Sequence, residues 1–464
     1  MDDVLAGFPA PWVERAVTDP AELGDLEHRL ARAGRVLVVV GSSISGLVLA
    51  ARLGALARRD EGLRVVLVAG APPVRRRLVA GCSLRRSTVR RMAGAISVDD
   101  AVLFGRLGGR AASFRRLAVA RAEPGSAPPR LVARKTDAGF EPYVGLSTRH
   151  GAILAALRES LNPALDVTVV AGDVPRDEPL AGGRLPLLLK GERASLALPA
   201  GRAVVLNATS RADLLRPGAT VPAPERYVVA VQAPLRVVAG DGRPWCGDDV
   251  GLAPMTFGPP APQLAFFTPF RDSDTPDATW YGINTLTLSA ADLDAAGGPA
   301  AVTTAVWDRL VELEAGLGFA EIDPGETRGE AVVPVVRDTG RVTEAGLDNG
   351  SPVVDVHRSF GSGAPAINVD GMLAAAVGAD AFATAFAAAG PGAAPPAAAR
   401  AALAAADTAL RPVRWRNQAT EWLFFQAPEA VRAAAARNTR LGWKGFVFDW
   451  MHLGGRAGRG RRRR

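Results

Sequence analysis

Residues 35–47, with the sequence RVLVVVGSSISGL, show most clearly how this chain of 464 residues folds. The consecutive apolar residues Val36–Val40 are typical of a buried strand in a parallel sheet. Gly41 and Gly46 bound the turn that follows, and an apolar helix is expected over residues 44–59. A strand that passes directly into a helix points the unpaired amides of the first helical turn, and the positive end of the helix dipole, at one place. The sequence therefore predicts an anion site of the kind that holds a dinucleotide pyrophosphate.

The surrounding pattern predicts an α/β fold. A second buried strand is expected at 63–68, which completes a strand–helix–strand unit. Further strands are expected at 167–170 and 203–206, and an amphipathic helix at 148–161. From about 225 to 340 alternating strands dominate, which indicates an inserted mixed sheet. We expect a Rossmann-like domain with an inserted mixed β-sheet domain and a helical C-terminal region.

The expected domain boundaries follow these changes in pattern and composition. They are 1–34 for an N-terminal extension, 35–224 for the first part of the nucleotide-binding domain, 225–340 for the inserted substrate-domain sheet, 341–390 for the return segment of the first domain, 391–454 for a helical C-terminal cap and 455–464 for an arginine-rich tail.

Three further segments accompany the glycine loop in a recognisable order: Ser147–Leu157, Val204–Arg216 and Ala366–Gly371. With Gly41–Leu47 they resemble motifs of the FAD-dependent monooxygenase and reductase superfamily of para-hydroxybenzoate hydroxylase and geranylgeranyl reductase. The resemblance covers about residues 35–390 and implies an FAD-binding domain. The residues that it implies as cofactor contacts are Gly41, Ser43, Ile44, Ser45, Gly46, Arg149, Asp370 and Gly371.

Within this set the resemblance implies distinct roles. The amides near Ser45 and Gly46 would meet the pyrophosphate, Arg149 would contact FAD from the start of a helix, and Asp370 would accept a hydrogen bond from the ribityl chain.

The chain also departs from the superfamily pattern at several positions. Ser43 replaces the middle glycine of the loop, and Val369 replaces the glycine before Asp370. The second strand ends at Ala69, where the superfamily usually has an acid that binds the adenosine ribose. The missing acid would also suit NADP as sole cofactor, with a nearby arginine such as Arg75 taking its phosphate. The Arg149 and Asp370 segments favour FAD instead.

Aromatic residues in the inserted sheet are candidates for the substrate wall, because the superfamily places its substrate there. The candidates are Phe267, Trp280 and Tyr281. Packing in the core of the sheet is the alternative for each.

The resemblance implies an FAD-dependent oxidoreductase, and a monooxygenase fits it best. Such an enzyme would transfer oxygen from a flavin hydroperoxide to a sizeable, natural-product-like organic substrate. A flavin-dependent halogenase or a prenyl reductase is the alternative within the fold, although the halogenase motif W-x-W-x-I-P is absent from the sequence. A non-catalytic protein with weakened cofactor binding is the alternative of another class. We expect NAD(P)H to bind transiently as reductant, or a separate flavin reductase to supply reduced flavin; no catalytic acid or base is assigned.

Composition favours a cytoplasmic, metal-free protein. No apolar run has membrane-spanning length, and the acidic N-terminus lacks the layout of a signal peptide. Cys82 and Cys246 are too few for a disulfide framework, and the four histidines lack the spacing of metal ligands. The net charge of +8 owes much to six arginines among the last nine residues, so we expect no nucleic-acid partner.

The C-terminal region 411–454 is rich in aromatic residues. Its segment 441–451 is apolar and precedes the terminal arginines, which is typical of a peripheral membrane contact. A helix packed over the core is the alternative.

Overall fold

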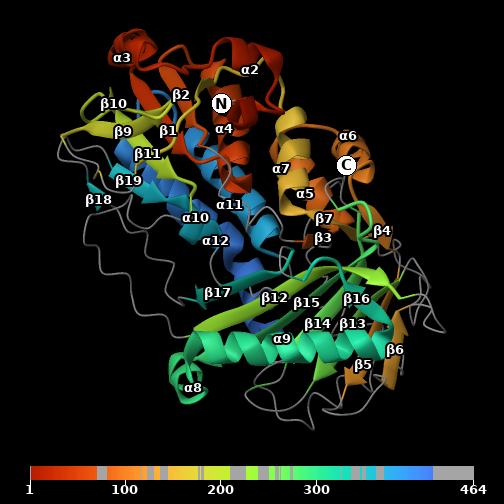
Figure 1. Ribbon diagram of the computed structural model, residues 1–464. Helices are drawn as coiled ribbons and strands as arrows, with labels where there is room; N and C mark the ends of the chain where they lie inside the picture. Colours follow the sequence, from red (N-terminus) through yellow and green to blue (C-terminus); the bar gives the residue numbers. More distant parts are fainter. Residues whose placement is uncertain are drawn as a thin grey trace, which may run out of the picture.

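The computed structural model describes residues 2–70, 81–114, 116–122, 130–135, 145–175, 178, 182–209, 226–238, 250–256, 261, 263–271, 275–324, 327–335, 345–346, 352–361 and 370–421. Figure 1 shows a first half with a parallel sheet and helices, and a second half in which a broad sheet lies on one long helix.

The sheet of the first half has the strand order β18-β19-β11-β1-β2-β8. Its strands are β1 (Arg35–Val40), β2 (Leu63–Val68), β8 (Thr168–Val170), β11 (Ala203–Asn207), β18 (Ala345–Gly346) and β19 (Pro352–Asp355). All pairs are parallel except β18 with β19. Every residue of β1 is buried, as expected for a central strand with both faces covered. The strands predicted from apolar runs are thereby confirmed.

Successive side chains of β1 point to opposite faces of the parallel sheet, and each face has its own hydrophobic core. Leu37 and Val39 belong to the core formed with the helices, whereas Val36 and Val38 belong to the core on the other face. The first face carries α4 (Ile44–Ala57), α5 (Arg86–Ala95), α6 (Asp100–Gly108), α7 (His150–Glu159), α10 (Val356–Gly361), α11 (Asp370–Ala388) and α12 (Pro395–Glu421). The second face carries α3 (Leu23–Arg32), which follows the short helix η1 (Pro20–Glu22), and the hairpin of β9 (Arg184–Leu189) and β10 (Glu192–Ala197).

Helix α11 is a core helix. Within the described residues, its segment Gly371–Ala388 alone is long and apolar enough to cross a membrane. Half of this segment is buried inside the protein, where α11 packs against α4 and α12. Its apolar character therefore follows from burial between two helices.

The N-terminal segment is built into the first domain. It contains α1 (Asp2–Leu5) and α2 (Ala10–Glu14). Phe8 and Trp12 are buried in the main core, and Val17 pairs in parallel with Val170 of β8. The segment predicted as an N-terminal extension therefore adds one parallel bridge beside β8.

The sheet of the second half has the order β16-β12-β15-β14-β13-β5-β6, with β17 also paired to β12. Its strands are β5 (Arg116–Ala122), β6 (Arg130–Lys135), β12 (Arg226–Val237), β13 (Val250–Thr256), β14 (Gln263–Pro269), β15 (Trp280–Ser289), β16 (Phe319–Glu321) and β17 (Gly329–Val335). Helices α8 (Ala290–Ala295) and α9 (Gly298–Leu317) follow β15, and α9 runs along one face of the sheet (Figure 1).

This sheet draws on more of the chain than residues 225–340. Strands β5 and β6 come from the stretch that the sequence placed in the first domain, and β5 pairs in parallel with β13. The mostly antiparallel sheet is thus mixed, as expected.

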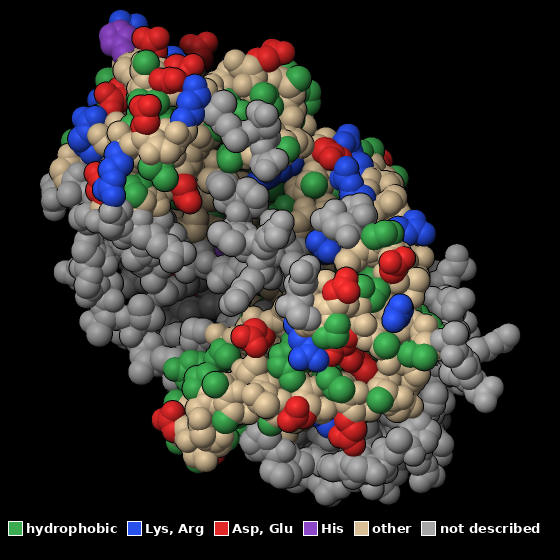
Figure 2. All heavy atoms as spheres, in the orientation of Figure 1, with side chains coloured by type: hydrophobic (Ala, Val, Ile, Leu, Met, Phe, Trp, Pro, Cys, Tyr) green, Lys and Arg blue, Asp and Glu red, His purple; other side chains and the backbone are tan. Residues whose placement is uncertain are grey.

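A small antiparallel sheet, β3-β7-β4, contacts α5 and α7 of the first half. Its strands are β3 (Gly81–Arg85), β4 (Ala112–Phe114) and β7 (Gly145–Arg149). Ser147 of β7 and Thr268 of β14 share a hydrogen bond of 2.9 Å between their hydroxyls, so this sheet meets the second half. In the face of the molecule shown in Figure 2, cationic and anionic side chains are intermixed.

The C-terminal end of the described chain is α12, which packs on α11. The aromatic residues beyond Glu421 and the arginine-rich tail 455–464 lie outside the described residues, so the predicted membrane contact stays a prediction.

Candidate functional site

The loop between β1 and α4 lies at the carboxyl end of the parallel sheet. Gly41 has a φ of +102°, a left-handed conformation that favours glycine, and a Cβ there would lie 2.6 Å from Thr209 Cγ2. A Cβ at Gly46 would overlap the carbonyl oxygen of Gly41. The two glycines therefore allow the tight turn and the close packing of α4 on the strand that a dinucleotide loop requires.

Ser43 is the N-cap of α4. Its Oγ accepts a hydrogen bond from the Gly46 amide at 3.4 Å, donates to the carbonyl of Ala208 at 2.7 Å and lies 3.1 Å from Ser45 Oγ. The serine that replaces the middle glycine therefore stabilises the start of the helix and ties it to β11. The amides of Ile44 and Ser45 belong to the first helical turn, which has no intrahelical acceptor for them. This arrangement fits an anion.

Arg158 of α7 places a cation beside this loop. Its guanidinium donates a hydrogen bond of 2.7 Å to Ser42 Oγ, although the residue is only 8% exposed. Further contacts run to the carbonyls of Val4 and Ala6 at 3.4 and 3.3 Å, and the group lies 4.8 Å from the centre of the Phe8 ring. Desolvation lowers the pKa of Arg158, because burial penalises the charged form.

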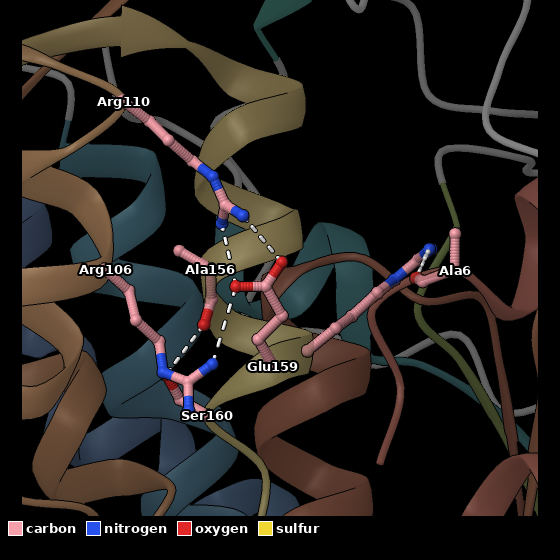
Figure 3. A network of polar contacts seen from close by, with 7 residues as sticks. Ala6, Arg106, Arg110, Ala156, Glu159 and Ser160 are labelled. Carbon is pink, nitrogen blue, oxygen red and sulfur yellow. Dashed lines mark hydrogen bonds and ion pairs between the residues drawn. The ribbon is translucent and has the colours of Figure 1, made fainter. Parts of the chain in front are cut away.

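No carboxylate of the described residues compensates this buried charge. The adjacent acid, Glu159, is bound by Arg110 at 2.7 and 2.9 Å and by Arg106 at 3.4 Å (Figure 3). The hydrogen bond from Arg110 lowers the pKa of Glu159, so this carboxylate is committed to that pair. Arg158 Nε is buried without a hydrogen-bond partner in the described structure. A buried cation beside unpaired helix amides favours an anionic ligand. Sequence reasoning missed Arg158, because nothing in its local pattern marks it.

Arg149 is the N-cap residue of α7, at the end of β7. Its guanidinium donates to Thr275 Oγ1 at 2.9 Å, so the side chain reaches the connection between β14 and β15 in the second half. Arg149 therefore lies where the two halves meet. Its contact with FAD stays a prediction.

The last two residues of the fourth motif begin α11. Asp370 is the first residue of the helix and Gly371 the second. The side chain of Asp370 lies outside the described residues, as do 210–225, which hold most of the third motif. At the described end of that motif, Asn207 Oδ1 accepts hydrogen bonds from the amide and hydroxyl of Thr209 at 3.0 and 2.6 Å, which forms a turn after β11.

The three aromatic candidates for the substrate wall lie on opposite faces of the second sheet. Phe267 and Trp280 are buried in the core formed with α9, and both pack on Phe319 at ring distances of 5.5 and 5.1 Å. Tyr281 pairs with Thr268 across the strands and so shares the face that meets β7. The placement of Phe267 and Trp280 corrects the expectation that they line the wall, because alternation along the strand turns them toward the helix. Tyr281 is also buried, in a small cluster with Phe270 and Ala278 on the opposite face, so its contact with a substrate stays a prediction.

The helices α4 and α7 carry all three features of the site: the glycine loop precedes α4, Arg158 lies on α7, and Arg149 at the start of α7 marks the boundary between the two halves. These residues fit a dinucleotide such as FAD, whose pyrophosphate would take the helix amides and whose length would reach toward Arg149.

Comparison with known proteins supports this fold. No family model matches the sequence, and no curated protein matches it. Among solved structures, FqzB is similar with a TM-score of 0.56 and 15% identity, over 91% of this chain and 96% of FqzB. A variant of MHPCO, 2-methyl-3-hydroxypyridine-5-carboxylic acid oxygenase, has a TM-score of 0.52 and 16% identity, over 90% and 95% of the two chains.

A variant of HpxO from Klebsiella pneumoniae, complexed with FAD, has a TM-score of 0.50 and 15% identity, over 88% of this chain and 94% of HpxO. The chain therefore has the fold of the FAD-dependent monooxygenase and reductase superfamily that its sequence motifs resemble.

Proposed function

We propose that this protein is an FAD-dependent oxidoreductase, and specifically a monooxygenase that acts on a sizeable organic substrate. The observation that carries the proposal is the buried, acid-free guanidinium of Arg158 beside the N-terminus of α4, at the carboxyl end of a parallel sheet. Ligands of open α/β sheets bind at this edge. The likeness to an oxygenase and to a protein complexed with FAD supports the chemistry.

Several residues would hold the cofactor. The amides of Ile44 and Ser45 would take the pyrophosphate, with Ser43 fixing the loop through its bonds to Ala208 and Gly46. Arg158 would neutralise part of the pyrophosphate charge. Bound FAD supplies the redox chemistry, and the protein supplies position, charge and exclusion of water.

The substrate would bind between the halves. The face of the second sheet that carries Tyr281 and Thr268 meets the small sheet of the first half through Ser147. Arg149 reaches across the same boundary to Thr275. We place the organic substrate against this face, on which Tyr281 packs with Phe270 and Ala278.

The first experiment is a titration of the purified protein with FAD, followed by flavin fluorescence and the visible spectrum. We expect FAD to bind saturably, and we expect ADP to compete with FAD for the site. The reductant is then identified by oxygen consumption with NADH, with NADPH, and with a separate reductase that supplies reduced FAD. Stimulation of NAD(P)H oxidation by the protein alone supports transient NAD(P)H binding.

The competing hypothesis is a non-catalytic protein that keeps this fold. It is favoured if neither oxidised nor reduced FAD binds at micromolar concentration. A prenyl reductase or a halogenase is favoured if FAD binds but the reduced protein saturates a prenyl chain or transfers halide instead of oxygen.

A further inference from the structure

β2 is not followed by the acid that usually binds the adenosine ribose. The neighbouring strand, β8, is followed by an acid shortly after its end. Val68 of β2 is in register with Val170 of β8. Beyond this pair the Ala69 amide donates to the carbonyl of Val170 at 2.9 Å, and the Gly172 amide donates to the carbonyl of Ala69 at 3.1 Å. The chain after β8 is therefore held against the end of β2, and the next residue is Asp173.

The backbone of Asp173 has a defined place. Its amide donates to the carbonyl of Leu188 at 3.1 Å, and the Leu188 amide donates back to its carbonyl at 2.7 Å. A Cβ at the preceding Gly172 would overlap Leu189 Cδ2 and lie 2.9 Å from the carbonyl oxygen of Leu188. Glycine at 172 thus allows the chain to pack closely on β9, and this packing directs Asp173 toward β2.

The carboxylate of Asp173 lies close to Gly70, in space that a side chain at position 70 would occupy. A Cβ at Gly70 would lie 3.0 Å from Asp173 Oδ1 and 3.2 Å from its Cγ. Asp173 Oδ1 accepts a hydrogen bond from the Val174 amide at 2.8 Å, and within the described structure this is its one hydrogen-bond donor. The residue is exposed at the sheet edge, so the rest of the carboxylate is open to a ligand.

The same edge carries the glycine loop. The Gly41 amide donates to the carbonyl of Val68 at 2.8 Å, so the loop and the end of β2 are directly joined. From β1 to β2 to β8 the order is that of a dinucleotide site, in which the adenosine ribose lies at the end of the second strand.

We infer that Asp173 takes the place of the absent acid and accepts hydrogen bonds from the adenosine ribose hydroxyls of FAD. The inference rests on the proposed function. The acid comes from the strand next to the usual one, and Gly70 leaves the space in which its carboxylate stands. A carboxylate here repels a ribose 2′-phosphate, so this site selects FAD or ADP over NADP.

The test compares ligands that have or lack the adenosine in the full-length protein. FAD, ADP, 2′-phospho-ADP-ribose and FMN are titrated against wild type, Asp173→Asn and Asp173→Ala. Asn keeps the oxygen that accepts from Val174 but removes the charge. We expect FAD and ADP to bind about 10-fold more weakly to Asp173→Asn and up to about 100-fold more weakly to Asp173→Ala. FMN affinity and the thermal midpoint stay at wild-type values, and discrimination against the 2′-phosphate falls.

Asp166→Asn is the matched control, because Asp166 is an acid just before the same strand whose half-exposed side chain lies 4.0 Å from Arg64. It leaves all four affinities unchanged. Wild-type FAD affinity in Asp173→Asn and Asp173→Ala would overturn the inference while leaving the proposed function intact. An equal loss of FMN and FAD binding would overturn it as well, because it would indicate a general structural role. If wild type binds neither FAD nor ADP, the proposed function itself fails, and the inference fails with it.

Discussion

Arg158 on α7 donates a hydrogen bond of 2.7 Å to Ser42 Oγ in the glycine loop, across 116 positions of sequence. The same guanidinium bonds to the carbonyls of Val4 and Ala6 in the N-terminal segment. One buried cation therefore joins the loop, a helix and the beginning of the chain.

Replacing Arg158 by methionine tests its role as a phosphate cation. The substitution keeps the length and apolar stem of the side chain but removes the charge. We expect FAD and ADP to bind about 10- to 100-fold more weakly, as for the loss of a charged hydrogen bond. Isothermal titration measures the affinities. Arg52→Met is the control, because Arg52 lies on α4 but pairs with Asp380 at 2.7 Å, away from the loop. Equal losses in the two variants would contradict a specific role for Arg158.

Glu314 predicts a pH dependence of stability. It is buried on α9, and its Oε1 has no hydrogen-bond partner in the described structure. Arg328, the nearby cation, bonds to Glu321 at 2.6 and 2.8 Å instead. Burial raises the pKa of Glu314 from 4.5 to about 8, and the charge of Glu321 adds to this shift. The protein therefore keeps Glu314 protonated at neutral pH.

Because the pKa is higher in the folded than in the unfolded chain, the folded state binds more protons over this range. The contribution of Glu314 to the free energy of unfolding is therefore greatest below about pH 4.5 and is lost as pH rises to about 8, by at most a few kcal/mol. Urea unfolding at a series of pH values measures the slope. Glu314→Gln flattens it, whereas Asp308→Asn, an exposed change on the same helix, leaves it in place. An identical slope in Glu314→Gln would contradict this assignment.

Gly46→Ala tests the packing of α4 on the loop. The added methyl group would overlap the Gly41 carbonyl oxygen, which is backbone and has little room to move. We expect a loss of about 1–3 kcal/mol in the free energy of unfolding, together with weaker FAD binding. Gly105→Ala in α6 is the matched control, because a Cβ there meets no atom within 4 Å. That change should raise stability by up to about 1 kcal/mol. A Gly46→Ala protein as stable as wild type would show that the loop relaxes freely.

Phe267→Ala and Tyr281→Phe separate the two faces of the second sheet. Phe267 is fully buried against Phe319 in the α9 core, so truncation should cost about 3–5 kcal/mol in the free energy of unfolding. Tyr281→Phe keeps the ring and should change stability by less than about 1.5 kcal/mol. Chemical denaturation followed by tryptophan fluorescence checks both. A small effect of Phe267→Ala would return Phe267 to the candidates for the substrate wall.

Much of the fold could be predicted because its signals are local. The apolar run of β1 and the turn at Gly41 lie within a few residues of each other, and α9 shows a continuous helical pattern. The strands β5 and β6 could not be assigned in this way. Their place in the second sheet depends on the pairing of β5 with β13, which is far away in the sequence.

The sequence alone specified the backbone of the site, because a buried strand followed by small residues and a helix creates unpaired amides wherever it occurs. Only the tertiary structure determined which charged side chains lie near those amides. Arg158 stands without an acid because Glu159 pairs with Arg110, and Asp173 reaches Gly70 because β8 lies beside β2. Backbone conformation depends on neighbouring residues, whereas the net charge at a point depends on every side chain that folding brings there.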